Sequence, residues 1–160
     1  MRTVRLAFAG SNDHPYRSVG GWLLQQGAVR DASWPGIKAW VRDNPQRLGE
    51  LLWSNPRVVF FREEPLAEAD VGGPRGAQGV ALTPGRSIAV DKDSIPYGTP
   101  VWLSTPGPVL ALNRLVFAQD TGSAIVGAVR ADYFVGWGAE AGDIAGRVKQ
   151  PLALWALWPR

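Results

Sequence analysis

The sequence predicts a mainly β protein in which a small closed β-barrel follows a short appendage of one strand and several helices. The 160 residues include 19 Gly and 13 Pro, which favour turns and short strands over long helices. Apolar residues make up 46% and charged residues 19%, which is typical of a globular domain with a buried core. From residue 57 onward, short strand-like runs alternate with turns, as in a small barrel.

The first third of the chain is expected to contain one strand and three helices. Residues 3–9 alternate apolar and polar side chains, which predicts a strand. The expected helices cover residues 16–26, start at Ser33 as an N-cap, and start at Asn44-Pro45. Gly27 is a plausible stop for the first helix. In the third helix we expect three leucines to be buried, namely Leu48, Leu51 and Leu52.

The rest of the chain predicts the barrel. Residues 58–61 are consecutive apolar residues and predict a buried strand, and residues 65–79 are polar and Gly-rich and predict a loop. Further strands are expected at residues 87–91, 100–104, 113–119 and 152–158, and a helix at residues 139–149 with Ala141, Ile144, Ala145 and Val148 inward. We place the domain boundary after residue 56, so the expected domains are residues 1–56 and 57–160.

Composition excludes several classes of function. The formal net charge is +3, and the basic residues are scattered, so no nucleic-acid-binding arm is expected. The chain has no Cys and a single His, His14, which leaves no means to build a disulfide, a thiol nucleophile or a multi-His metal site. We therefore expect neither a metal nor a cofactor. The chain shows no signal peptide and no apolar run long enough for a membrane helix.

The segment of residues 117–132 carries the candidate site. Asp120 and Asp132 lie twelve positions apart, each among small or apolar residues. A carboxylate in such surroundings is costly unless it is hydrogen-bonded or its altered protonation is useful. These two acids are therefore the leading candidates for chemistry.

Five motifs follow one another in order along the chain: NPRVVFFRE at residues 55–63, LTPGRSIAVD at 82–91, IPYGTPVWL at 95–103, QDTGSAI at 119–125 and RAD at 130–132. Together they resemble the membrane-bound lytic murein transglycosylase A family. Asp91, Asp120 and Asp132 resemble the three aspartates that give the 3D domain of that family its name. Residues 10–18 and 37–40 are similar to the second domain of the family.

The resemblance implies a double-psi β-barrel with a substrate groove between it and the second domain. It also implies cleavage of the β-1,4 bond between N-acetylmuramic acid and N-acetylglucosamine in peptidoglycan, with a 1,6-anhydro product and no added water. One acid suffices for this reaction, and the resemblance assigns that role to Asp132. Asp120 would lie beside it, where its like charge favours the protonated acid.

The resemblance further suggests which residues bind the glycan. They are Asp91, Thr121, Gly122, Ser123, Tyr16, Arg17 and Arg130. Gly122 is expected to allow a positive φ or the close approach of a sugar. Ser123 stands where the family usually has a second Gly, and it is expected to narrow the groove or to add a hydroxyl donor.

The resemblance implies peptidoglycan strands as the partner and a location in the periplasm or at the outer membrane. Attachment to the membrane would occur only through a lipid anchor that this chain does not carry, and we expect a monomer.

Other interpretations stay open. Asp132, Asp120 and Asp91 each have a structural alternative as turn or cap residues. The chain could be a shortened, catalytically weak module that binds peptidoglycan. It could also be a hydrolase in which Asp120 and Asp132 are paired as in inverting glycosidases.

Overall fold

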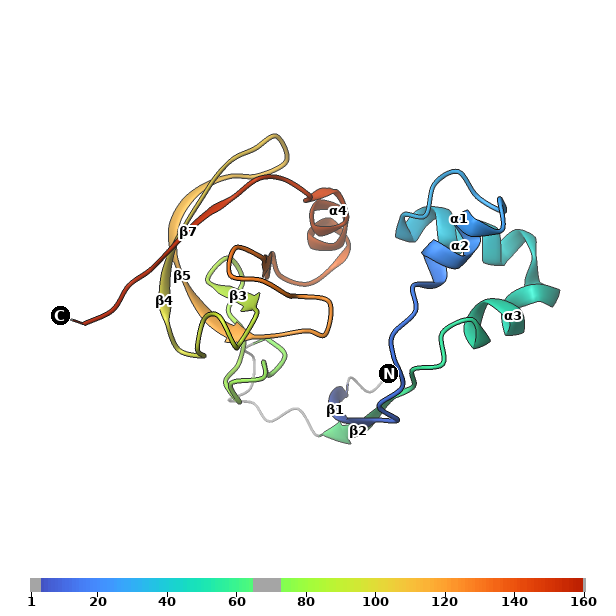
Figure 1. Cartoon of the computed structure of the whole chain (residues 1–160), viewed down its shortest axis with the longest axis horizontal. Helices are drawn as coiled ribbons and strands as arrows, with labels where there is room; N and C mark the ends of the chain where they lie inside the picture. Colours follow the sequence, from blue (N-terminus) through green and yellow to red (C-terminus); the bar gives the residue numbers. More distant parts are fainter. Residues whose placement is uncertain (1–3, 65–72, 160) are drawn as a thin grey trace. The chain divides into compact units, whose positions relative to one another are not determined.

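The computed structural model describes residues 4–64 and 73–159 (Figure 1). The chain divides into two compact units, one of residues Leu6–Glu64 and one that combines Met1–Arg5 with Pro65–Arg160. Each unit has its own cluster of buried apolar residues. Part of the loop expected at residues 65–79 lies outside the described residues. Within the described ranges, no helix has the length and apolar character needed to cross a membrane.

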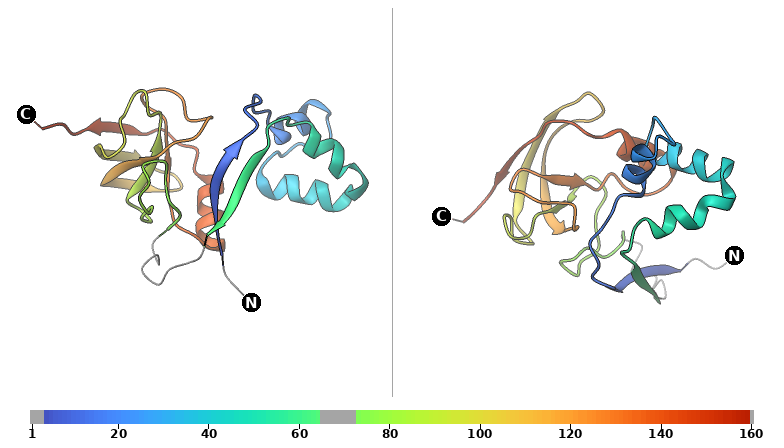
Figure 2. Two further views of the ribbon diagram at one scale, coloured as in Figure 1. Left: turned by 90° about the horizontal axis from the view of Figure 1, so that it is seen from below. Right: turned by 45° about the vertical axis from the view of Figure 1, so that its right-hand side comes forward.

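The unit of residues Leu6–Glu64 contains two paired strands and a group of short helices (Figure 2). The strands are β1 (Arg5–Ser11) and β2 (Val59–Glu64), and the helices are α1 (Val19–Gln25), α2 (Trp34–Asp43), the 3-10 helix η1 (Pro45–Arg47) and α3 (Leu48–Trp53). The expected cap is confirmed, because the Ser33 side chain accepts a hydrogen bond from the Gly36 N–H. Gly27 follows α1 with φ +65°, as its predicted role as a stop requires.

The core of this unit joins the three α-helices. Leu23, Trp40 and Leu51 are its buried residues, and the rings of Trp22 and Trp40 meet edge to face at 6.4 Å. The expected burial of three leucines in α3 is wrong for two of them, because Leu48 is 38% and Leu52 58% exposed. A six-residue helix turns fewer than two times, so it presents one side chain to the core rather than a stripe.

β2 is a strand, as expected, but its predicted burial is wrong. Val59, Phe60 and Phe61 are 40%, 54% and 59% exposed. The reason is the size of the sheet. Among the described strands β2 pairs only with β1, in a two-stranded sheet, and a strand buried on both faces needs further layers on each side.

The second unit is built on a five-stranded sheet with the order β6-β3-β5-β4-β7. Its strands are β3 (Ser87–Val90), β4 (Pro100–Pro106), β5 (Ala111–Asp120), β6 (Ala131–Tyr133) and β7 (Ala153–Ala156). β3 and β5 are parallel, and the other pairs are antiparallel. The sheet curls into a half-barrel (Figure 1). The predicted closed barrel is not formed by the described strands, because β6 and β7 are the edges of the sheet.

The core of the second unit lies against one face of this sheet. Along β4, Val101 and Leu103 are buried whereas Trp102 is 41% exposed, as the two-residue period of a strand requires. The other buried residues of this cluster are Ile88, Val90, Ile95, Val116 and Ala118. Helix α4 (Ala139–Arg147) forms as expected, and none of its residues is fully buried. Of the side chains predicted to face inward, Ala141, Ile144 and Val148 are half-buried and Ala145 is exposed, so the prediction is confirmed in part.

Candidate functional site

Asp120 and Asp132 lie on either side of β3. Ala89 is the register partner of Asp120 on β5 and also of Asp132 on β6. Neighbouring strands are about 4.8 Å apart, so the two aspartate Cα atoms are separated by about 10 Å. An irregularity in the ladder between Ile88 and Ala89 produces this alignment, since an unbroken register would place Gln119 opposite Ala89.

Both acids line one pocket of about 310 Å³. Its other walls are mainly apolar or aromatic, and they come from Leu82, Ser87, Ile88, Ala89, Thr121, Ile125, Tyr133 and Phe134. A concave surface with apolar walls and a few converging polar groups is typical of a small-molecule or sugar site. Of the predicted site residues, the structure brings Asp120, Thr121 and Asp132 together here.

Asp132 forms an ion pair with Arg130. The guanidinium Nε lies 3.0 Å and Nη2 lies 2.9 Å from Oδ1 of Asp132. The two side chains are 52% and 54% exposed, so the pair is open to solvent and to a ligand. Arg130 directly precedes β6, and its spacing of two residues from Asp132 could have indicated this pairing, because side chains two apart in an extended segment face the same side.

Asp120 is held by the backbone of a segment distant in sequence. Its Oδ1 accepts a hydrogen bond of 2.9 Å from the Ala77 N–H. The same segment approaches closely at Gly76, where an added Cβ would lie 2.3 Å from the carbonyl oxygen of Gln119. Only glycine permits this contact. The sequence contains no signal that could have predicted the Ala77 donor.

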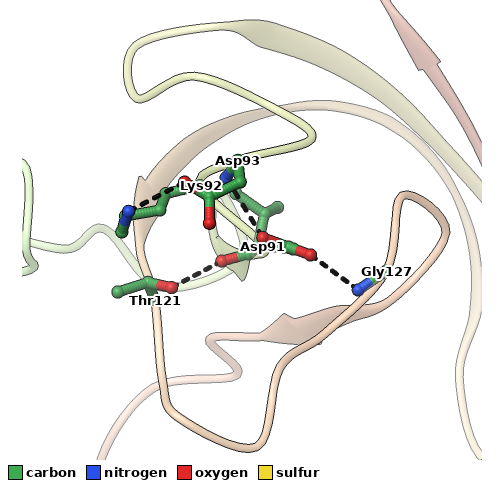
Figure 3. Close-up of polar contacts among 6 residues, drawn as sticks. Asp91, Lys92, Asp93, Thr121 and Gly127 are labelled. Carbon is green, nitrogen blue, oxygen red and sulfur yellow. Dashed lines mark hydrogen bonds and ion pairs between the residues drawn. The ribbon is translucent and has the colours of Figure 1, made fainter.

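Asp91 lies just beyond the end of β3 and does not line the described walls of the pocket. Its Oδ2 accepts a hydrogen bond of 2.7 Å from the Gly127 N–H, and its Oδ1 accepts one of 3.1 Å from the Asp93 N–H (Figure 3). Nearby, the Thr121 hydroxyl donates to the Val90 carbonyl at 2.7 Å. The Gly127 N–H, followed by the Asp93 N–H, lowers the pKa of Asp91 below its ordinary value.

The remaining predicted residues lie elsewhere. Gly122 is not among the glycines with positive φ, so that alternative is wrong, and the close approach of a sugar stays a prediction. A Cβ at Gly122 would meet Ile125 at an ordinary 3.4 Å. Ser123 is exposed. Tyr16 and Arg17 belong to the unit of residues Leu6–Glu64. Tyr16 is 55% exposed there, and the Arg17 N–H donates to Asn55 Oδ1 at 3.0 Å.

Sequence reasoning missed the aromatic wall of the pocket. Tyr133 and Phe134 directly follow Asp132 and line the pocket with it. The Tyr133 hydroxyl accepts a hydrogen bond from Arg114 Nη1 at 3.1 Å. Arg114 lies on β5, so this bond ties the Tyr133 ring to a strand on the far side of β3. The run Asp132-Tyr133-Phe134 was visible, but which side each ring faces depends on the tertiary structure.

Comparison with known proteins gives two family matches. Residues 1–62 match the MltA specific insert domain, and residues 86–158 match the 3D domain. Membrane-bound lytic murein transglycosylase A of Vibrio cholerae is 36% identical over 94% of this chain and 42% of its own length. The chain therefore spans less than half of this curated relative.

Solved structures give the same relationship. The lytic transglycosylase LtgG of Burkholderia pseudomallei is 55% identical, with a TM-score of 0.62 over 96% of this chain and 46% of that one. MltA of Escherichia coli with bound chitohexaose is 32% identical, with a TM-score of 0.82 over 96% of this chain and 46% of that one. From the two domain matches and these relatives, we conclude that the chain belongs to the membrane-bound lytic murein transglycosylase A family.

Proposed function

We propose that the chain contributes the catalytic acids of a peptidoglycan lytic transglycosylase. The observation that carries this proposal is the placement of Asp120 and Asp132 opposite the same residue, Ala89, at one pocket. The family relationship supplies the reaction class. The E. coli relative with bound chitohexaose supports a glycan as the ligand.

In the proposed mechanism Asp132 is both acid and base. Its protonated carboxyl group gives a proton to the glycosidic oxygen, and the bond from that oxygen to C1 of N-acetylmuramic acid breaks. The resulting carboxylate then takes the proton of the C6 hydroxyl of the same sugar. The C6 oxygen bonds to C1 and closes the 1,6-anhydro ring. Asp132 ends protonated as it began, and no water is consumed.

Neighbouring charges act on the two halves of this cycle in opposite directions: Asp120 favours the neutral acid that starts it, and Arg130 favours the anion that forms during it. After the first proton transfer Asp132 is an anion, and the Arg130 guanidinium at 2.9 Å stabilises it. Asp120 keeps its position through the Ala77 N–H and adds negative charge beside the cationic sugar of the transition state. Ordinary glycosidases instead use two carboxyl groups as acid and as nucleophile or base.

We propose that Thr121, Gly122 and Ser123 after β5 contact the glycan. Tyr16 and Arg17 are proposed as glycan-binding residues of the unit of residues Leu6–Glu64. The half-barrel sheet is proposed to form part of a double-psi β-barrel. The relatives are named membrane-bound, which supports a location in the periplasm or at the outer membrane. The proposed partner is a peptidoglycan strand, and the proposed state is a monomer.

Product analysis tests the reaction. We expect purified peptidoglycan incubated with the protein to release 1,6-anhydro-muropeptides that mass spectrometry detects. Asp132→Asn should abolish their release, because an amide cannot cycle a proton, whereas Asp143→Asn on exposed helix α4 should not. Full lytic activity in Asp132→Asn would contradict the assignment, and products with reducing ends would identify a hydrolase.

Chelation gives a second check. Among the described residues no group of three or more His, Cys, Asp or Glu side chains could hold a metal ion. The proposed proton cycle uses no metal, so EDTA should leave the rate unchanged. If EDTA removed the activity and an added divalent metal restored it, the metal-independent proton cycle would be contradicted.

A peptidoglycan-binding module of low activity is the second candidate. The observation that favours it is the open half-barrel, whose edge strands β6 and β7 are unpaired among the described strands. β6 carries Asp132, so an unsupported edge could leave the acid poorly placed. Glycan that sediments with the protein and stays uncut would favour this function.

A further inference from the structure

We propose that Asp91 is a positioning residue for Asp132, and that it acts through Gly127 and Arg130 rather than by contact with the glycan. The inference rests on the proposed role of Asp132 as the acid. It gives the third aspartate of the 3D motif a function different from that of the other two.

The first link joins the end of β3 to the loop of residues 121–130. Asp91 Oδ2 accepts the Gly127 N–H at 2.7 Å, while Oδ1 accepts the Asp93 N–H at 3.1 Å (Figure 3). A hydrogen bond to an ionised carboxylate is about twice as strong as one between neutral groups. Each carboxylate oxygen therefore already has a backbone donor, and the pocket walls do not include Asp91.

The second link runs from the loop to the acid. The Gly127 carbonyl accepts a hydrogen bond of 3.2 Å from the Arg130 N–H. The Arg130 side chain in turn contacts the Asp132 carboxylate at 2.9 Å. A continuous series of polar contacts thus leads from Asp91 through one turn of backbone to the acid.

Few other contacts among the described residues hold the loop of residues 121–130 in place. Ile125 is its one buried residue, whereas Val126 is 74% and Val129 is 65% exposed. The other polar anchor to β3 is at the start of the loop, where the Thr121 hydroxyl donates to Val90 O. Loss of the Asp91 contact would therefore free the half of the loop that leads into Arg130 and β6.

A substitution at Asp91 has an expected kinetic signature. Asp91→Asn keeps the size of the side chain but puts an amide NH₂ where one of the two backbone donors must bind. A displaced acid slows the chemical step, and misplacement by about 1 Å can reduce a rate on the order of 100-fold. We expect kcat on a soluble glycan-strand fragment to fall about tenfold or more while KM changes little.

Asp93→Asn is the matched control. It removes the same charge two residues away, at a side chain that pairs with exposed Lys92 and leaves the Asp91 contacts in place. We expect its kcat to equal that of the wild type. A rise in KM with unchanged kcat in Asp91→Asn would overturn the proposal, because it would indicate direct binding of substrate. Equal losses of kcat in both variants would also overturn it.

Amide NMR tests the path without activity, so failure of the proposed function does not leave it undecided. In the wild type the Gly127 amide should shift with the titration of the Asp91 carboxylate, which requires no variant. In folded Asp91→Asn the amides of Gly127, Arg130 and Asp132 should all shift, and in Asp93→Asn they should not. If the chemical shift of the Gly127 amide did not change during titration of the Asp91 carboxylate, the contact would be refuted. If the wild type releases no anhydro product while these shifts occur, the proposed reaction fails but the contact stands.

Discussion

At the scale of single residues, Asp91 shows how backbone donors can fix a charge that is open to solvent. Its carboxylate accepts from Gly127 at 2.7 Å and from Asp93 at 3.1 Å. Asp132 is different, because its partner is the side chain of Arg130. A side-chain partner can rotate away from a substrate, whereas a backbone partner moves only with its loop. The two aspartates therefore suit different tasks.

The first prediction concerns the pH dependence of stability. The Gly127 N–H and then the Asp93 N–H lower the pKa of Asp91, so folding favours its ionised form. The stabilisation is complete above the pKa of the unfolded state, about 3.9 for Asp. It is lost as pH falls through the lower pKa of the folded state.

Urea unfolding of the wild type and Asp91→Asn from neutral pH to about pH 2 checks this. The wild type should be the more stable at neutral pH, and the difference should disappear at the acid end. Asp93→Asn controls for the removal of one negative charge. A stability difference that grows toward low pH would have the wrong sign for this linkage.

At the scale of elements, the loop of residues 121–130 depends on one glycine. Gly127 has φ +100°, a backbone conformation that L-residues rarely adopt, and an added Cβ would meet no atom within 4 Å. The requirement for glycine is therefore conformational and not steric.

A pair of glycine-to-alanine substitutions tests this distinction. Gly127→Ala should destabilise the folded protein by about 1–2 kcal/mol, the usual cost of left-handed backbone for a residue with a Cβ. Gly142→Ala, inside helix α4 and also free of contacts within 4 Å, should instead stabilise by about 0.5–1 kcal/mol. If both substitutions changed the free energy of unfolding by the same amount, the backbone at Gly127 would accept a side chain without strain, and the distinction would be wrong.

At the scale of the whole molecule, the buried apolar residues of the described ranges form two clusters with no shared member. Leu23, Trp40 and Leu51 form one, and the other includes Leu103 and Val116. The two units therefore obtain their burial of apolar surface separately.

Matched leucine substitutions check this separation. Leu23 and Leu103 are 0% and 2% exposed, and each Leu→Ala change should cost about 2–5 kcal/mol. Hydrogen exchange followed by mass spectrometry should show lost protection in residues 6–64 for Leu23→Ala and in residues 73–159 for Leu103→Ala. Loss of protection across both units from either substitution would show that they unfold as one.

Much of the fold could be predicted because its signals are local. Ser33 caps α2, Gly27 ends α1, and the predicted strands β3, β4, β5 and β7 lie where short apolar runs meet Gly and Pro turns, whereas the three-residue strand β6 was not predicted. Helix caps, helix stops and the two-residue period of a strand depend on side chains that are close together in the sequence. The resemblance to the transglycosylase family came from ordered motifs of the same kind.

The tertiary structure decided what depends on distant partners. In the tertiary structure β2 is exposed and the five-stranded sheet stays open. Gly127 has a positive φ, whereas Gly122 does not. The tertiary structure also aligned Asp120 and Asp132 on Ala89 through a shift in strand register. The sequence by itself determined which acidic residues the chain carries and the family that its motifs resemble. Their alignment required the tertiary structure, because register is set by pairing between strands far apart in the chain.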